Sequence, residues 1–423
     1  MINRPLNIAD HATLMMDNEI RRSGLAGNFC AIVYELDGSP DVAFLEQRAE
    51  RFVEHFPEID VRLRQQGRRY HWVANPEKGN LFFHQTTDSR ENALLAVEEI
   101  LNRSEECEAA VPVTFHLIES PKGIFFLIRW FHPICDAKGA ELIIHHFLND
   151  EEVQQGEDAF AQLTSKWSIW KKLGMMLHAK RHIKRLDRLS STLPAICETG
   201  QGRLKFHTIS FDAEKTKAII TRSMKEVGMT GTSLYFIGCL MRAIDQAGSL
   251  EKEGFCVPFA MNIRKRKALF PLVGNQVTFL FAQASMEQVR DRSALFKTLR
   301  EQYKQTVRDG LEYAMIPLME AGSWLSLEKF GDIIRNAPKG GERSSFWFSY
   351  TGEPDPKVVS VAGARVLAMF QLSQVTAPPS LAMLVNQYNG ILTFSFSYIA
   401  GQIDQQWLNL LIEKLSVELN GQD

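Results

Sequence analysis

Several features that mark whole classes of proteins are scarce or missing in this sequence. The 423-residue chain has six cysteines, and the closest two, Cys239 and Cys256, are 17 residues apart. It therefore lacks the CxxC pairs of zinc and thioredoxin-type sites. No run approaches the roughly 18 apolar residues that span a bilayer, and charges interrupt the N-terminal stretch where a signal peptide needs an apolar core. We expect a cytoplasmic protein with reduced thiols, in contact at most with the surface of a membrane.

Charge of one sign does not dominate either. Lys and Arg total 48 and Asp and Glu total 50, which gives a formal net charge of −2. A dedicated nucleic-acid-binding protein usually has a large basic excess, so we expect no nucleic acid among the partners. Hydrophobic residues make up 45% and charged residues 23%, a composition typical of globular proteins that excludes global disorder.

The secondary-structure signals alternate irregularly between strands and helices. Apolar, β-branched runs predict strands, periodic apolar residues predict helices, and turn signals predict hairpins. The clearest strands cover 29–36, 111–119 and 123–131, and the clearest helices cover 213–227 and 404–419. The predicted fold class is therefore α/β, or α+β with mixed sheets. We divide the chain into a first lobe (1–165), a basic crossover segment (166–200) and a second lobe (201–423).

The best candidate for chemistry follows the apolar run 123–131. His132 comes directly after this run and Asp136 lies four residues later. A neutral imidazole can accept a proton near pH 7, and the carboxylate can fix the ring or pair with an arginine. The alternative is a core histidine, with Asp136 as the N-cap of a helix over 140–148. Cys135 also raises the alternative of a Cys/His hydrolase, although such pairs usually come from distant sequence positions.

The sequence F-H-P-I-C-D-A over 131–137 resembles the HHxxxDG motif of the chloramphenicol acetyltransferase-like superfamily. This superfamily comprises CoA-dependent acyltransferases, peptide-synthetase condensation domains and wax ester synthase/diacylglycerol acyltransferases. His132 and Asp136 match the motif, whereas Phe131 replaces its first histidine and Ala137 its glycine. A glycine follows two residues further on, as Gly139.

Looser matches to the superfamily follow in the expected order along the chain. They are the opening strand and its lead-in (9–38), a P-x-L-R-x-R…W hairpin (57–72), VPV-x-x-R (257–264), GN-x-V (274–277), Ser-Asn-x-x-Gly (349–352) and YNG-x-L (388–392). Tyr350 replaces the asparagine in the Ser-Asn-x-x-Gly match. Together these matches cover nearly the whole chain.

The resemblance implies two similar lobes with a tunnel between them and His132 midway along it. His132 would accept the proton of a hydroxyl or amine that attacks a thioester carbonyl, and would return it to the departing thiolate without a covalent enzyme intermediate. Asp136 would point away and pair with an arginine, Arg264 first and Arg64 second. Supporting or tunnel-lining positions would be Phe131 and Gly139, with Asn275 and Ser349 as candidate oxyanion donors.

The resemblance also implies the partners. There would be no bound cofactor and no metal, with acyl-CoA or an acyl-carrier thioester as co-substrate, a small-molecule acceptor, and an acyl carrier protein as a candidate partner. The leading hypothesis is acyl transfer to a hydroxyl. The alternatives are a stand-alone condensation-type enzyme, which forms an amide or ester from a carrier-bound acyl group, and a non-catalytic relative that kept the fold.

The segment 166–190 has its own pattern. It holds eight Lys or Arg against one Asp, with Trp167, Trp170 and Leu177 in an apolar stripe at helical spacing. A basic amphipathic helix with tryptophan can lie on a membrane. It can also bind an acidic carrier protein or CoA phosphates, or pack its stripe against the lobes with the lysines in solvent. A stripe packed against the lobes would exclude the membrane alternative and leave only the basic face to explain.

Overall fold

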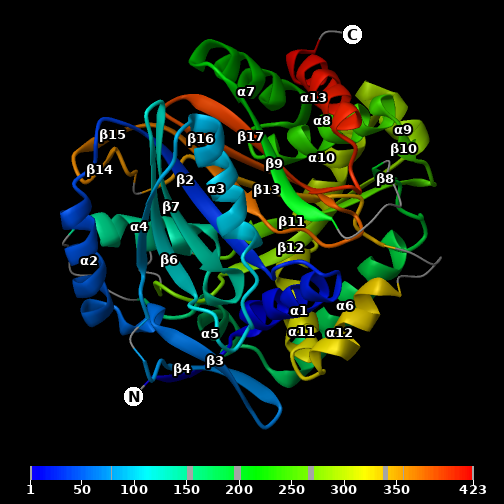
Figure 1. Cartoon of the computed structure of the whole chain (residues 1–423). Helices are drawn as coiled ribbons and strands as arrows, with labels where there is room; N and C mark the ends of the chain where they lie inside the picture. The colour runs from blue at the N-terminus through cyan, green and yellow to red at the C-terminus, as the bar shows by residue number, and fades with distance from the viewer. Residues whose placement is uncertain are drawn as a thin grey trace.

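Two six-stranded sheets with helices packed on them form the body of the protein (Figure 1). A computed structural model describes residues 2–77, 79–149, 156–194, 202–264, 271–336, 342–355 and 357–421. The first sheet has the order β14-β15-β2-β7-β6-β5. Its strands are β14 (Ser360–Val361), β15 (Ala364–Ser373), β2 (Phe29–Asp37), β7 (Gly123–Phe131), β6 (Val113–Ser120) and β5 (Phe82–Thr86).

Strand β7 lies at the centre of the first sheet, as its sequence predicts. It pairs antiparallel with β2 on one side and with β6 on the other. Its side chains from Phe125 to Ile128 are fully buried, because a strand covered on both faces favours a continuous apolar run. The predicted β6–β7 hairpin is confirmed, with Ser120 opposite Gly123 at its turn.

The second sheet comes from the C-terminal half of the chain and has the order β12-β11-β13-β16-β17-β9. Only β13 is parallel to its neighbours, β11 and β16. The strands are β12 (Val277–Ser285), β11 (Gly254–Asn262), β13 (Trp347–Gly352), β16 (Leu381–Tyr388), β17 (Ile391–Ala400) and β9 (Arg203–Phe211). Shorter strands form two small sheets, β1 (Asn3–Pro5) with β4 (Arg69–Ala74) and β3 (Val61–Gln66), and β8 (Leu193–Pro194) with β10 (Ser249–Leu250).

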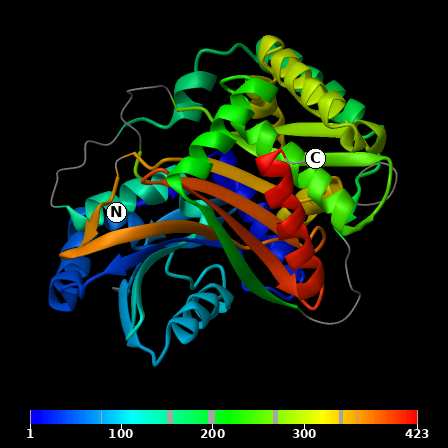
Figure 2. The ribbon, with the colours of Figure 1, turned by 90° about the horizontal axis from the view of Figure 1, so that it is seen from above.

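Strand β15 joins the two halves of the chain. It follows β13 in sequence but pairs antiparallel with β2 in the first sheet, and Figure 1 shows it among the N-terminal strands. The Asn386 side chain on β16 donates to the Met369 carbonyl on β15 (2.9 Å), which links the sheets directly. Seen from above, the strands of the second sheet lie over those of the first (Figure 2). Strand β15 is not among the strands predicted from the sequence.

Helices cover the sheets and close two large apolar cores. Helices α2 and α4 contact the first sheet, and α3 contacts both β7 and β9. Helices α7, α8 and α10 contact the second sheet, and α13 packs on α7 and α8. The bounds are α1 (Ile8–Arg22), α2 (Val42–His55), α3 (Arg90–Asn102), α4 (Ala137–Leu148), α5 (Ala159–Thr164), α6 (Ile169–Leu186), α7 (Ala213–Val227), α8 (Thr232–Ala247), α9 (Met286–Arg290), α10 (Arg292–Arg308), α11 (Leu311–Gly322), α12 (Leu327–Arg335) and α13 (Gln405–Asn420).

Two stretches at the ends of the first lobe and of the crossover segment contain short ordered elements. The polar stretch 150–165 contains the short helix α5, whose N-cap is Asp158, and 193–201 begins with β8, which pairs with β10. Residues 150–155 and 195–201 lie outside the described ranges. Among the described helices, none is by itself long and apolar enough to cross a membrane, and α7 with α8 passes that test only as a pair bent by 94°.

Candidate active site

His132 lies directly after β7, where the buried strand ends in a single turn of 3-10 helix. Its backbone N–H donates to the Asn28 carbonyl (2.8 Å), and its carbonyl accepts from the Asn275 side chain (2.9 Å). Within the described residues, the imidazole Nδ1 is buried and has no hydrogen-bond partner, whereas Nε2 is not among the buried atoms that lack one. Nε2 is therefore the better candidate of the two ring nitrogens for contact with a reacting molecule.

Burial lowers the pKa of His132 below its ordinary value. The opposing contributions of its own backbone carbonyl, of Asp136 and of Asn275 do not cancel this effect. The imidazole is therefore neutral at pH 7, which is the state that can accept a proton.

The Asp136 carboxylate is fully committed to protein partners. It forms a bidentate ion pair with Arg264, at 2.7 Å and 2.9 Å, which confirms the partner expected first from the sequence. It also accepts from the backbone N–H groups of Gly139 (3.0 Å) and Gln276 (2.8 Å). Burial alone would raise the pKa of Asp136, but Arg264 and these two N–H groups hold it below its usual value. The carboxylate is thus a structural anion, and it also caps α4.

The loop after β7 docks on a segment from the other half of the chain, residues 272–276. The Gly274 N–H donates to the Ile134 carbonyl (2.6 Å), beside the pairing of Gly274 with Cys135. Gly274 has a φ of +101°, a conformation that favours glycine. Together with the contacts of Asp136, these bonds hold the histidine loop from both ends.

Asn275 and Asp10 form a pair that sequence reasoning missed. Asp10, in the first turn of α1, accepts from both the backbone N–H (2.7 Å) and the side chain (2.8 Å) of Asn275. The same Asn275 amide donates to the His132 carbonyl. Burial raises the pKa of Asp10 to about 6, against the opposing effects of Arg4 and of the bonds from Asn275 and Asn7. The only sequence signal for this pair was the position of Asp10 in the match over 9–38.

This geometry changes the role expected for Asn275. Both hydrogens of its amide are already used, one toward Asp10 and one toward the His132 carbonyl. It therefore positions the histidine and has no donor left for an oxyanion. Ser349, the other candidate, is half-buried on β13 and makes no side-chain hydrogen bond to the described residues. Strand alternation puts it on the same face as Trp347, which packs against the first core.

The remaining predicted residues have structural roles. Phe131 is 1% exposed and packs on Phe29 (ring centroids 5.1 Å apart), so it belongs to the core and lines no open space. Gly139 lies where a Cβ would come within 2.8 Å of the Cys135 Cβ, so only glycine fits there. Ala137 starts α4 without a positive φ, and no glycine is required in its place. Arg64 is instead an exposed partner of Glu108 (3.2 Å).

Cys135 is completely buried, and burial raises the pKa of its thiol well above the ordinary value. A protonated, inaccessible thiol is a poor nucleophile. The structure therefore disfavours the Cys/His hydrolase alternative. Within the described residues, no group of three or more His, Cys, Asp or Glu side chains is arranged to hold a metal ion.

No protein-family model and no curated protein matches the chain. Solved structures do match over its whole length. A trichothecene 15-O-acetyltransferase from Fusarium sporotrichioides is 10% identical, with 99% of this chain and 95% of that chain covered and a TM-score of 0.73. The first condensation domain of the calcium-dependent antibiotic synthetase is 12% identical, with 99% and 96% covered and a TM-score of 0.73. The chain has the fold of the chloramphenicol acetyltransferase-like superfamily. A third member of this fold, polyketide synthase associated protein 5 from Mycobacterium tuberculosis, is 12% identical, with 99% of each chain covered and a TM-score of 0.66.

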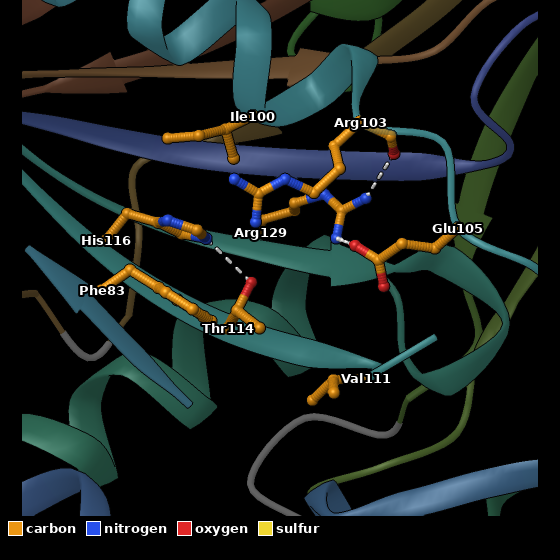
Figure 3. A pocket seen from close by; sticks show the side chains of 8 residues that line it. All are labelled: Phe83, Ile100, Arg103, Glu105, Val111, Thr114, His116 and Arg129. Carbon is orange, nitrogen blue, oxygen red and sulfur yellow. Dashed lines mark hydrogen bonds and ion pairs between the residues drawn. The ribbon is translucent and has the colours of Figure 1, made fainter. Parts of the chain in front are cut away.

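The first lobe of the chain holds a cavity of about 220 Å³, which His132 does not line (Figure 3). Arg129 of β7 lines the cavity, where it forms an ion pair with Glu105 (2.8 Å) and donates to the Arg103 carbonyl (3.0 Å). Arg129 also lies over the Phe29 ring, 3.6 Å from its centroid. Burial lowers the pKa of Arg129 to about 10, so it stays charged at pH 7. It fastens the loop after α3 to the sheet, and the signal for it was the one charge in the run 123–131.

Proposed function

We propose that the protein transfers an acyl group from a thioester, acyl-CoA or an acyl-carrier thioester, to a hydroxyl acceptor, with His132 as the general base. The observation that carries the proposal is the fixation of His132. Its backbone is held by Asn28 and Asn275, and its buried Nδ1 has no hydrogen-bond partner among the described residues. Buried polar atoms normally have a hydrogen-bond partner, so an unpaired buried ring nitrogen calls for an explanation such as a catalytic role.

In the proposed reaction, the acceptor oxygen attacks the thioester carbonyl carbon while its proton moves to Nε2 of His132. The carbonyl π electrons move to the oxygen, which gives a tetrahedral oxyanion. When the oxyanion collapses, the C–S bond breaks and the proton moves from Nε2 to the departing sulfur. The histidine returns to its neutral form, and no group on the protein is acylated.

The neighbours of His132 act on its position in this proposal. Asp136 has no capacity left for a substrate, because two N–H groups and Arg264 use both of its oxygens. It holds the loop, and the Asp10–Asn275 pair holds the histidine carbonyl. Ser349 remains the proposed donor to the oxyanion, since its hydroxyl is uncommitted among the described residues and preorganised donors stabilise such charge.

A condensation-type reaction is the second candidate. The solved condensation domain matches this chain with the same TM-score as the acetyltransferase. In that case the donor would be bound to an acyl carrier protein, and the acceptor would be an amine or a hydroxyl. The same histidine chemistry would apply, because an attacking amine must also lose a proton.

Thiol release with identification of the product by mass separates these functions. The purified protein is given acyl-CoA thioesters of increasing length, or the same acyl groups on a carrier protein, with a panel of alcohols and amines. Ester formed from free acyl-CoA supports the leading proposal, whereas product formed only from the carrier thioester supports the condensation alternative. If the wild type forms no product from either donor, and so does not differ from His132→Ala, the proposed catalysis is contradicted. His84→Ala is the control histidine variant. His84 lies on the edge strand β5 and forms an ion pair with Glu119 of β6.

A further inference from the structure

Helix α6 has two apolar rows on opposite faces. At 100° per residue, Met175, Ala179 and Leu186 share one face, and they pack against the second core. Trp170, Leu173 and Leu177 share the other face. The single stripe expected from the sequence is therefore two rows, and only one of them is covered by the protein.

The outward row is strongly exposed. The exposed fractions are 72% for Ile169, 78% for Trp170, 41% for Leu173 and 45% for Leu177. Trp167, just before the helix, differs because it is half-buried and packs against the small cluster that contains Phe160. Large apolar side chains in a continuous exposed row mark an interaction site more often than an ordinary surface.

Positive charge follows this outward row along the helix. Exposed basic residues continue it toward the C-terminus of α6: Lys180, Arg181, Lys184 and Arg185. Lys171 lies instead over the ring of Trp167, 5.3 Å from its centroid. Helix α6 contains no acidic residue. Its Lys172 is the exception among the lysines, because it turns inward and pairs with Glu320 of α11 (2.9 Å).

Contacts at both ends keep this face turned outward. Lys172 and Glu320 join the helix to α11 near its start, and the Gln283 side chain donates to the Leu186 carbonyl at its end (2.8 Å). Directly after the helix, Asp187 pairs with Arg343 (2.7 Å). The row cannot turn onto the protein body without breaking these contacts.

We infer that the outward face of α6 docks on an anionic lipid bilayer, with Ile169, Trp170, Leu173 and Leu177 entering the interface and the basic residues facing the headgroups. Cationic side chains complement an anionic surface, and tryptophan favours the membrane interface. An acidic carrier protein would also attract the charges, but it would not need a row of four protruding apolar side chains. The inference does not depend on the proposed acyl transfer, because none of these residues contacts the His132 loop in the described structure.

The test is co-sedimentation of the full-length protein with vesicles of phosphatidylcholine alone or mixed with phosphatidylglycerol. We expect binding to the mixed vesicles at low salt and a steep loss as salt rises, because salt screens the attraction. Each basic residue near the surface contributes about fivefold to partitioning. Lys180→Gln/Arg181→Gln/Lys184→Gln should therefore bind roughly a hundredfold more weakly. Trp170→Ala/Leu177→Ser should lose binding by about tenfold per side chain.

Matched variants on other helices serve as controls. Lys215→Gln/Lys217→Gln/Lys225→Gln removes three exposed lysines from α7, and Leu95→Ser removes a 52% exposed leucine from α3. Both should bind vesicles as the wild type does. The difference between wild-type and Trp170→Phe fluorescence should shift to the blue on binding. No vesicle binding at low salt, equal binding to neutral vesicles, or equal losses in the control variants would overturn the inference. So would binding of an acidic carrier protein, lost in the α6 variants, without any vesicle binding.

Discussion

Replacing Asp136 by asparagine should destabilise the protein far more than an ordinary loss of one charge. One carboxylate oxygen accepts from Gly139 N–H and one Arg264 nitrogen, and the other accepts from Gln276 N–H and the second Arg264 nitrogen. An asparagine keeps one oxygen and presents an NH₂ group at the other position. In either orientation that NH₂ meets one backbone N–H and one guanidinium N–H, so two hydrogen bonds become contacts between donors.

The magnitude follows from the burial of the pair. The side chains of Arg264 and Asp136 are 3% and 6% exposed, so the stranded donors cannot turn to water. Each unsatisfied buried group costs about 1–3 kcal/mol, and removing one partner of a buried ion pair costs about 3–5 kcal/mol. We expect Asp136→Asn to lower the free energy of unfolding by about 3–5 kcal/mol.

Urea unfolding at pH 7 measures this loss. The control is Asp37→Asn, which removes an equally short ion pair with Arg365 (2.7 Å) whose side chains are 56% and 71% exposed, and which should cost under about 1 kcal/mol. Asp136→Asn/Arg264→Met should be less destabilised than the sum of its single variants, because no charge is left unpaired. A loss for Asp136→Asn no larger than that of Asp37→Asn, or additive single effects, would refute the reasoning.

Three further outcomes are expected. Because the pKa of His132 is lowered and the protonated ring cannot accept a proton, kcat/KM should hold constant as pH falls to 6.5, the ordinary histidine value, and decline only below it; a decline centred above 6.5 in a pH–rate profile would argue against His132 as the base. Asn275→Ala frees the His132 carbonyl and should lower kcat by about 10²-fold with little change in KM, and steady-state kinetics showing the reverse split would contradict a positioning role. Cys135 should resist iodoacetamide in the native protein, and Cys135→Ala should keep activity, whereas rapid labelling with loss of activity would revive a thiol mechanism.

Local signals explain which parts of this structure could be predicted from the sequence. Strand β7 and its hairpin with β6 follow from an apolar run and a turn, both of which are short-range features. The Asp136–Arg264 pair was reached through the resemblance of two motifs, although the residues lie 128 positions apart. At β7, at its hairpin and at the Asp136–Arg264 pair, the structure agrees with the prediction.

Long-range packing decided what the sequence did not reveal. Strand β15 has an ordinary strand sequence, but its place beside β2 depends on pairing across most of the chain. Asp10 and Asn275 meet from positions 265 residues apart, and neither belongs to the histidine motif. On α6 the periodicity indicated a helix, but only the positions of α11 and the second sheet determine which apolar row is covered.

The rate of acyl transfer by His132→Ala tests the central claim most directly. The assay follows thiol release and ester formation from the thioester that the wild type uses, and urea unfolding verifies that the variant is folded. Loss of a general base typically lowers the rate by about 10²–10⁴-fold, and we predict a loss in this range with an unchanged free energy of unfolding. A folded His132→Ala protein that turns over near the wild-type rate would contradict the account.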